Sequence, residues 1–187
     1  MSQKNIAILI SGKGSNAKNL LMQEQLCKKF IFHILSSKEN EYLSAFCESR
    51  NTAYQEFSKN ADERNNELSS YLDQNNIDFI VLAGYLKLIP KDIIVRFRGK
   101  IINIHPSLLP KFGGHGMYGK HVHKAVFESN QKFSGVTIHY VNEEYDKGEI
   151  IKQVSVNIES CENPLEIEKE IQKIEHRLLP DTIMQIW

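Results

Sequence analysis

Short runs of β-branched and other apolar residues alternate with polar segments of helical spacing through the first hundred residues of this chain. The runs occupy residues 5–10, 30–35, 79–82 and 100–104. They show little polar alternation, which is typical of strands buried on both faces of a parallel sheet. Between them, residues 16–28 and 62–75 place leucines on one side of a predicted helix. This strand–helix–strand order predicts a parallel sheet with right-handed crossovers.

The pattern changes after a helix-like stretch at residues 118–129. Apolar residues recur at alternate positions around 136–140 and 150–156, and the connection at 142–148 is too short to hold a crossover helix. These two segments are therefore predicted to be antiparallel strands. A long amphipathic helix closes the chain, with Pro164 near its start and Pro180 expected to kink or end it.

The expected fold is a single doubly wound, Rossmann-like α/β domain over residues 1–187, mostly parallel, with an antiparallel C-terminal hairpin. The length is near that of one domain, and the sequence shows no internal repeat or linker. Lysine plus arginine and aspartate plus glutamate both total 23. This balance argues against nucleic-acid binding, which normally needs a basic excess.

Location is inferred from the cysteines and the apolar runs. No run approaches the roughly 20 residues that span a bilayer, and the N-terminus lacks the features of a signal peptide. Cys27, Cys47 and Cys161 are odd in number and widely spaced, which favours reduced thiols over disulfides or zinc. We therefore expect a cytoplasmic protein with no membrane partner.

A glycine-rich loop lies between the first predicted strand and the first predicted helix. Gly14, Ser15 and Asn16 stand where backbone N–H groups at a helix start can bind an anion, so the loop indicates a phosphate site. A plain turn with a Ser/Asn cap remains the alternative. The spacing Gly12-x-Gly14-x-x-Ala17 also fits a dinucleotide fingerprint, but the acidic residue expected about 20 positions on is missing. A single phosphate fits better than NAD.

Asn103 and His105 stand two positions apart on an apolar predicted strand, so their side chains share one face. An amide and an imidazole together suit the stabilisation of an oxyanion. Asp146 lies in the turn of the strand pair, where it is either a turn former or a carboxylate that raises the pKa of His105. His121-x-His123 is half of a metal pattern, but these residues do not converge on a helix, so no metal is expected.

Four segments closely resemble the phosphoribosylglycinamide formyltransferases, a family of folate-dependent one-carbon transferases. The segments are residues 10–16 (ISGKGSN), 81–85 (VLAGY), 103–110 (NIHPSLLP) and 145–148 (YDKG). The resemblance implies direct formyl transfer from 10-formyltetrahydrofolate to the amine of glycinamide ribonucleotide (GAR), through a tetrahedral intermediate and without a metal. The partners it implies are small molecules, and the chain is expected to be a monomer or a weak homodimer.

The resemblance also implies roles for individual residues. Asn103, His105 and Asp146 would be catalytic, with Asp146 raising the pKa of His105. The other implied residues bind the ribonucleotide (Gly14, Ser15, Asn16 and Glu175) or the folate (Leu86, Lys87, Leu88, Ile89 and again Asn103). Two features depart from the family. The segment at residues 112–119 is longer and richer in glycine than in many family members, which implies a mobile lid or a close backbone approach. Ala61 stands in the place of a folate-site arginine of the family, and Arg64 lies three positions later.

Three alternatives remain open at this point. A formyltetrahydrofolate deformylase would use water in place of the amine. Another folate-dependent N-formyltransferase, acting on a sugar nucleotide or on methionyl-tRNA, would share Asn103, His105 and Asp146. A non-catalytic phosphate-binding module would need only the glycine loop and would leave those three residues unexplained.

Overall fold

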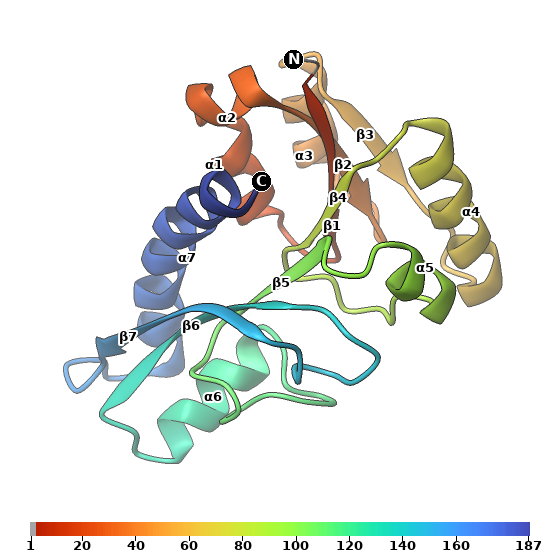
Figure 1. Ribbon diagram of the computed structural model, residues 1–187. Helices are drawn as coiled ribbons and strands as arrows, with labels where there is room; N and C mark the ends of the chain where they lie inside the picture. Colours follow the sequence, from red (N-terminus) through yellow and green to blue (C-terminus); the bar gives the residue numbers. More distant parts are fainter. Residues whose placement is uncertain (1–2) are drawn as a thin grey trace. The chain divides into compact units, whose positions relative to one another are not determined.

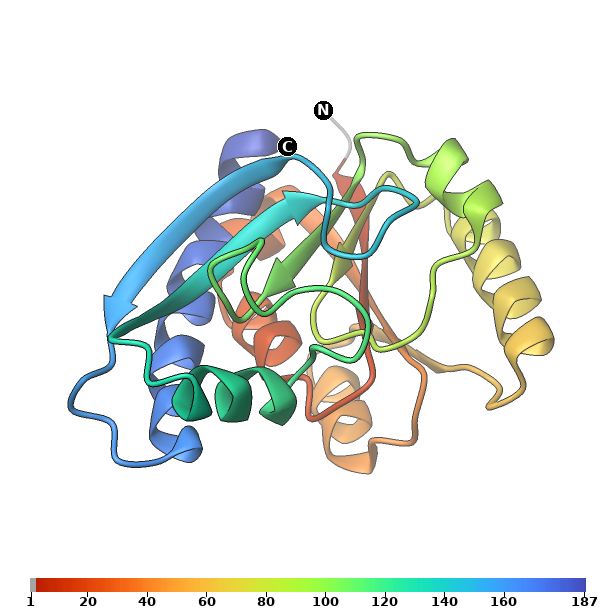
Figure 2. The same cartoon turned by 90° about the horizontal axis from the view of Figure 1, so that it is seen from below.

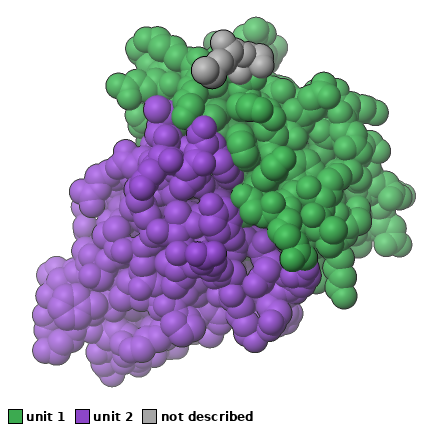
Figure 3. All heavy atoms as spheres, in the orientation of Figure 1, with its two compact units in different colours: residues 1–101 green, residues 102–187 purple. Residues whose placement is uncertain are grey.

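A computed structural model describes residues 3–187 of the chain (Figure 1). The chain divides into two compact units, Met1–Ile101 and Ile102–Trp187, which are coloured separately in Figure 3. No helix in the described part is both long and apolar enough to cross a bilayer.

Unit 1 contains four parallel strands in the order β3-β2-β1-β4. They are β1 (Lys4–Ile10), β2 (Phe30–Ser36), β3 (Ala53–Glu56) and β4 (Phe79–Leu82). Ile8 of β1 pairs with Ile34 of β2 on one side and with Val81 of β4 on the other. These three side chains are fully buried, as expected for a parallel strand covered on both faces. The strands predicted at 5–10, 30–35 and 79–82 are confirmed.

The helices of unit 1 are α1 (Ser15–Leu21), α2 (Glu24–Lys29), α3 (Glu41–Glu48), α4 (Ala61–Gln74) and α5 (Lys91–Arg96). The prediction of one helix over residues 16–28 is wrong, because the helix is interrupted at Met22 and Gln23. The backbone of Gln23 is extended there (φ −87°, ψ 98°). The helix predicted at 62–75 is α4, which begins after Asn60, whose side chain accepts hydrogen bonds from the N–H groups of Asp62 and Glu63.

Unit 2 holds the antiparallel part of the fold. Its strands are β5 (Ile101–His105), β6 (Phe133–Tyr140) and β7 (Ile150–Asn157), in the order β5-β6-β7. The helix α6 (Lys120–Glu128) precedes β6, and α7 (Pro164–Ile186) ends the chain. Helix α7 packs against α6, β6 and β7 (Figure 2). The predicted antiparallel pair and the mostly parallel α/β class are therefore confirmed.

The last helix corrects one expectation. Pro180 does not end α7, which continues to Ile186. Proline removes one backbone donor, but Leu179 and Ile183 on either side of Pro180 are fully buried. Burial of these apolar side chains stabilises the helix beyond Pro180. Its start is as expected, with Pro164 in the first turn and the Asn163 side chain accepting hydrogen bonds from the backbone.

Candidate active site

The glycine loop of unit 1 ends at Gly14, the N-cap residue of α1. Gly14 is left-handed (φ 71°, ψ 30°), and a Cβ there would lie 2.5 Å from Leu43 Cδ2. The position therefore favours glycine both for its conformation and for space. Because glycine has no side chain with which to cap the helix, the backbone N–H groups of the first turn suit an anion. Ser15 and the buried Asn16 follow directly.

Hydrogen bonds from neighbouring segments hold this loop. Ser11 Oγ lies 2.6 Å from Ser37 Oγ and accepts a hydrogen bond from the Leu86 N–H at 2.9 Å. Asn40 Nδ2 donates to the Gly12 carbonyl at 3.0 Å. Ser11 thus joins the loop to the segment expected to line the folate pocket. Ser11 is not among the predicted site residues, although a polar residue directly after an apolar strand was a usable signal.

The segment after β4 combines exposed and buried apolar residues. Leu86 and Leu88 are 40% and 61% exposed, whereas Ile89 is buried. Lys87 between the two leucines is half-buried. Exposed leucines that directly follow a buried strand offer apolar contact area to a ligand.

The three predicted catalytic residues meet in unit 2. Asn103 and His105 lie on the same face of β5, and Asp146 lies in the turn between β6 and β7. The Asp146 Oδ2 atom is 3.7 Å from His105 Nδ1. The Asp146 Oδ1 atom accepts a hydrogen bond from Asn103 Nδ2 at 3.4 Å. The contact between Asp146 and His105, which the sequence alone left open, is therefore present.

A fourth residue, His139, completes this cluster. It is the register partner of Asn103 across the β5–β6 pair and is only 2% exposed. Its Nδ1 donates to the Tyr140 carbonyl at 2.8 Å, so its Nε2 accepts from Asn103 Nδ2 at 3.1 Å. The same Nε2 lies 3.6 Å from Asp146 Oδ1. His139 is not among the predicted site residues, although its position on an apolar predicted strand was a usable signal.

The first residues of the glycine-rich segment after β5 contact the cluster of His105 and Asp146. His105 Nε2 donates to the Phe112 carbonyl at 2.8 Å, and the Gly114 N–H donates to Asp146 Oδ2 at 2.8 Å. A Cβ on Gly113 would lie 2.4 Å from Leu109 Cδ2 and 3.3 Å from Asp146 Cβ. Glycine is therefore needed at this position for a close backbone approach, one of the two roles expected for the segment.

Burial sets the protonation of His105. Burial lowers its pKa below the ordinary value, while the charge of Asp146 and the hydrogen bond to the Phe112 carbonyl act in the opposite direction and do not offset it. The expectation of a raised His105 pKa is therefore wrong in net direction, although Asp146 contributes with the expected sign. The pKa of Asp146 is lowered: burial opposes its ionisation, but the contacts with His139 and His105 and the hydrogen bond from the Gly114 N–H outweigh burial.

These protonation states define what the cluster can do. His105 is neutral near pH 7 and carries its proton on Nε2, Asp146 is ionised, and Asn103 presents an amide donor. Two neutral donors beside a carboxylate can stabilise a developing oxyanion and accept or pass on a proton. In residues 3–187, no group of three or more histidine, cysteine or acidic side chains is placed to hold a metal ion.

The remaining predicted residues lie elsewhere in the fold. Glu175 is half-buried on α7 in unit 2. Arg64 is buried on α4 in unit 1, where its Nη1 donates to the Lys59 carbonyl at 3.3 Å. The structure thus gathers the three residues predicted to be catalytic in unit 2, whereas Gly14–Asn16 and Leu86–Ile89 belong to unit 1.

Comparisons with known proteins agree on one family. The pattern that defines the formyl transferases matches residues 4–183. A phosphoribosylglycinamide formyltransferase of Arabidopsis thaliana, described as chloroplastic, is 37% identical over 97% of this chain. A protein of the same name from Bacillus subtilis is 31% identical over 98% of this chain and 94% of its own length. The chain spans about three fifths of the length of the plant relatives that it matches.

Solved structures show the same fold. The crystal structure of phosphoribosylglycinamide formyltransferase from Bacillus halodurans superposes with a TM-score of 0.87 at 31% identity. That match covers 98% of this chain and 95% of the solved one. The α/β fold with its antiparallel C-terminal strands is therefore common to this chain and to that structure.

Proposed function

Since the chain belongs to the formyl transferase family, we propose that it transfers the formyl group of 10-formyltetrahydrofolate to the amine of glycinamide ribonucleotide in purine synthesis. The contacts that join Asn103, His105 and Asp146 carry this proposal. The names of the relatives from Arabidopsis thaliana and Bacillus subtilis support the choice of acceptor. In this proposal residues 1–187 act as one formyltransferase domain, and formyl folate is a co-substrate.

Substrate binding is assigned to residues outside the catalytic cluster. Gly14, Ser15 and Asn16 would bind the phosphate of the ribonucleotide, which suits the first turn of α1. The exposed leucines of residues 86–89 would contact the folate ring system. Glu175 would bind the ribonucleotide from α7. A monomer contains every residue that this proposal uses, and a weak homodimer is equally compatible with it.

The reaction begins with attack of the GAR amine on the formyl carbon. Negative charge then develops on the formyl oxygen, where Asn103 Nδ2 and the His105 Nε2 proton would donate hydrogen bonds. In the free protein the Phe112 carbonyl accepts that His105 proton at 2.8 Å. The formyl oxygen would therefore replace the Phe112 carbonyl as the acceptor.

Proton movement completes the transfer. The attacking amine must lose a proton, and the leaving folate nitrogen must gain one. Asp146 is ionised beside His105 Nδ1, so it can accept the amine proton, directly or through water, and pass that proton to His105 Nδ1. The imidazolium formed in this way gives its Nε2 proton to the folate nitrogen as the tetrahedral intermediate collapses, which leaves His105 neutral and Asp146 ionised again.

We also propose a cytoplasmic location. Cys27, Cys47 and Cys161 are all unpaired in the described structure, as is usual in a reducing compartment. Because one relative is described as chloroplastic, a direct test is fractionation of the source cells followed by immunodetection of the protein.

The activity is tested with variants of the cluster. Formyl transfer from 10-formyltetrahydrofolate to GAR is measured for the natural chain, for His105→Ala and for Asn103→Ala. Loss of one oxyanion donor lowers kcat by about 10²–10³-fold, so each variant should show a loss of that size while its circular dichroism is unchanged. His121→Ala, an exposed histidine on α6, is the matched control and should keep full turnover. Equal turnover in His105→Ala and His121→Ala would contradict the assignment.

A further inference from the structure

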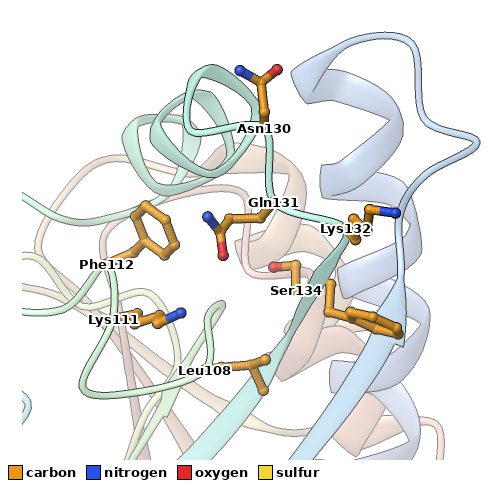
Figure 4. Close-up of a pocket in the computed structure, with 8 residues that line it drawn as sticks. Leu108, Lys111, Phe112, Asn130, Gln131, Lys132 and Ser134 are labelled. Atoms are coloured by element: carbon orange, nitrogen blue, oxygen red, sulfur yellow. The ribbon is translucent and has the colours of Figure 1, made fainter.

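A cavity of about 400 Å³ lies in unit 2 between the turn that follows β5 and the start of β6 (Figure 4). Leu108, Lys111 and Phe112 line it from the turn, and Gln131 and Ser134 line it from the other side. None of the residues assigned above to substrate binding or catalysis belongs to its lining. The cavity is therefore distinct from the formyl transfer site.

Ser134 gives this cavity an unsatisfied polar group. The residue is only 2% exposed, and its hydroxyl has no hydrogen-bond partner within the described part of the chain. Its oxygen points toward the open space in front of Phe112 and Lys111 (Figure 4). A buried hydroxyl without a partner is costly, so Ser134 is well placed to bond to a ligand.

The charge in the cavity comes from one lysine. Two lysines line it, but Lys132 pairs with Glu159 at 3.0 Å. Lys111 extends its ammonium group toward the space (Figure 4) and has no carboxylate partner among residues 3–187. The apolar part of the lining is the Phe112 ring together with Leu108. The cavity therefore presents one positive charge beside a flat apolar surface.

The rim is held in place by its own hydrogen bonds. Ser107 Oγ donates to the Lys111 carbonyl at 2.7 Å, and the Lys111 N–H donates to the Leu108 carbonyl at 3.1 Å. The Phe112 carbonyl in turn accepts from His105 Nε2. The lining is thus largely formed before any ligand arrives, as is usual for small-molecule sites.

We propose that this cavity binds a flat organic monoanion of the arylcarboxylate class. Lys111 would pair with the carboxylate, Ser134 would hydrogen-bond to it, and the ring would pack on Phe112 and Leu108. A volume near 400 Å³ is at the lower end of the range for small-molecule sites and far exceeds the size of an inorganic ion.

Binding here has a consequence for the proposed function, on which this step rests. A ring packed on Phe112 holds that residue in place, and its carbonyl then keeps the His105 proton. The formyl oxygen competes with the Phe112 carbonyl for the same proton, so an occupied cavity lowers turnover. The occupant and the substrates do not share a binding site, so inhibition should not be relieved by raising either substrate.

The binding test needs no catalytic activity. Benzoate is titrated into the ¹⁵N-labelled natural chain, with acetate and benzyl alcohol as probes for the charge alone and the ring alone. Benzoate should give saturable shifts of the Phe112 and Ser134 amides with a Kd of about 1 mM, as expected for a ligand of this size. No saturation by 20 mM benzoate, or equal binding of acetate or benzyl alcohol, would overturn the proposal.

Two cavity variants and a matched control locate the site. Lys111→Gln and Ser134→Ala should each weaken benzoate binding by about five- to tenfold. Lys169→Gln removes an exposed lysine of α7 and should leave binding unchanged. Binding that survives in both cavity variants would place benzoate elsewhere on the protein. Because the two variants change different residues, one of them still tests the location of the site if the other misfolds.

The turnover test is then separate. With the natural chain, benzoate near its Kd should halve kcat at saturating levels of both substrates, and Lys111→Gln should be resistant. Saturable binding without any change in turnover would support the binding site but contradict the proposed effect of its occupant on His105. A protein that binds benzoate but transfers no formyl group would refute the proposed function and leave the binding site standing.

Discussion

His105 has one ring nitrogen beside a carboxylate and the other bonded to a backbone carbonyl, so its protonation depends on the balance of several effects. Burial is the largest of them and favours the neutral ring. Asp146 opposes burial, but only in part. His105 is therefore a neutral donor in the free protein, and the proposed mechanism has the formyl oxygen replace the Phe112 carbonyl as the acceptor of its Nε2 proton.

The first residue-scale prediction concerns this titration. The His105 ring, followed by NMR as a function of pH, should titrate below the ordinary value of 6.5. Asp146→Asn removes a charge that raises the pKa, so it should lower the pKa further. Glu144→Gln, in the same turn but paired with Lys147, should leave the His105 titration unchanged. A His105 pKa above 6.5 in the natural chain would contradict the dominance of burial.

Gly14 provides the second residue-scale prediction. Gly14→Ala puts a Cβ on a left-handed residue and within 2.5 Å of Leu43 Cδ2, so it should lower the free energy of unfolding by about 1–3 kcal/mol. Gly12→Ala is the matched control, because a Cβ there meets no atom within 4 Å, and its effect should stay within about 0.5 kcal/mol. Urea unfolding measures both. An equal decrease in the free energy of unfolding for both variants would show that neither the left-handed conformation of Gly14 nor its contact with Leu43 requires glycine at this position.

Sequence reasoning reached part of the site at this scale. Asn103 and His105 could be placed together because a strand sets its side chains at alternate positions on one face. Asp146 was an open candidate from its turn, since an aspartate there is usually a turn former, and its catalytic role was implied only by the family resemblance. The direction of the His105 pKa was out of reach, because it depends on how deeply β5 is buried.

At the scale of elements, the Thr137 hydroxyl helps to join the chain after β5 to β6 and β7. Thr137 Oγ1 donates to the Ser107 carbonyl at 2.6 Å and accepts from the Leu109 N–H and from Gln153 Nε2. Thr137 is fully buried. It also lies opposite His105 in the strand register. This hydroxyl therefore fixes the chain that leads from the catalytic histidine to Phe112.

Replacing that hydroxyl tests the arrangement. Thr137→Val keeps the shape but leaves two buried polar groups, the Ser107 carbonyl and the Leu109 N–H, without this partner. It should therefore lower the free energy of unfolding by roughly 2–4 kcal/mol. Thr137→Ser keeps the hydroxyl and should lose only about 1 kcal/mol for the missing methyl group. Urea unfolding again gives the measurement. If the valine variant were as stable as the serine variant, the hydroxyl would not be a structural link.

Helices and strands were predicted correctly from the sequence where the apolar pattern was strong. The strands at 5–10 and 79–82 were clear because they are almost wholly apolar. Strand β3 and helices α3 and α5 were missed: β3 has four residues without full burial, and both helices are short. Of the two outcomes expected at Pro180, a kink or an end of the helix, the end is wrong, because tertiary burial of α7 outweighs the local preference of proline to end a helix.

At the scale of the whole molecule, the proposed activity uses residues from both compact units. The residues proposed to bind the phosphate and the folate belong to unit 1, and the residues proposed to be catalytic belong to unit 2. The fold class followed from the strand–helix alternation alone, because few architectures satisfy that order. The specific acceptor did not follow from the physics of the residues, and it rests on the resemblance and on the named relatives.

The most direct test of the account is the dependence of folate release on the acceptor. The natural chain is mixed with 10-formyltetrahydrofolate with and without glycinamide ribonucleotide, and tetrahydrofolate is followed by absorbance. The account predicts release only when the ribonucleotide is present, with one formylated ribonucleotide formed per folate released. Release at the same rate without the ribonucleotide would indicate a deformylase and contradict the account, as would folded protein that releases no folate in either mixture.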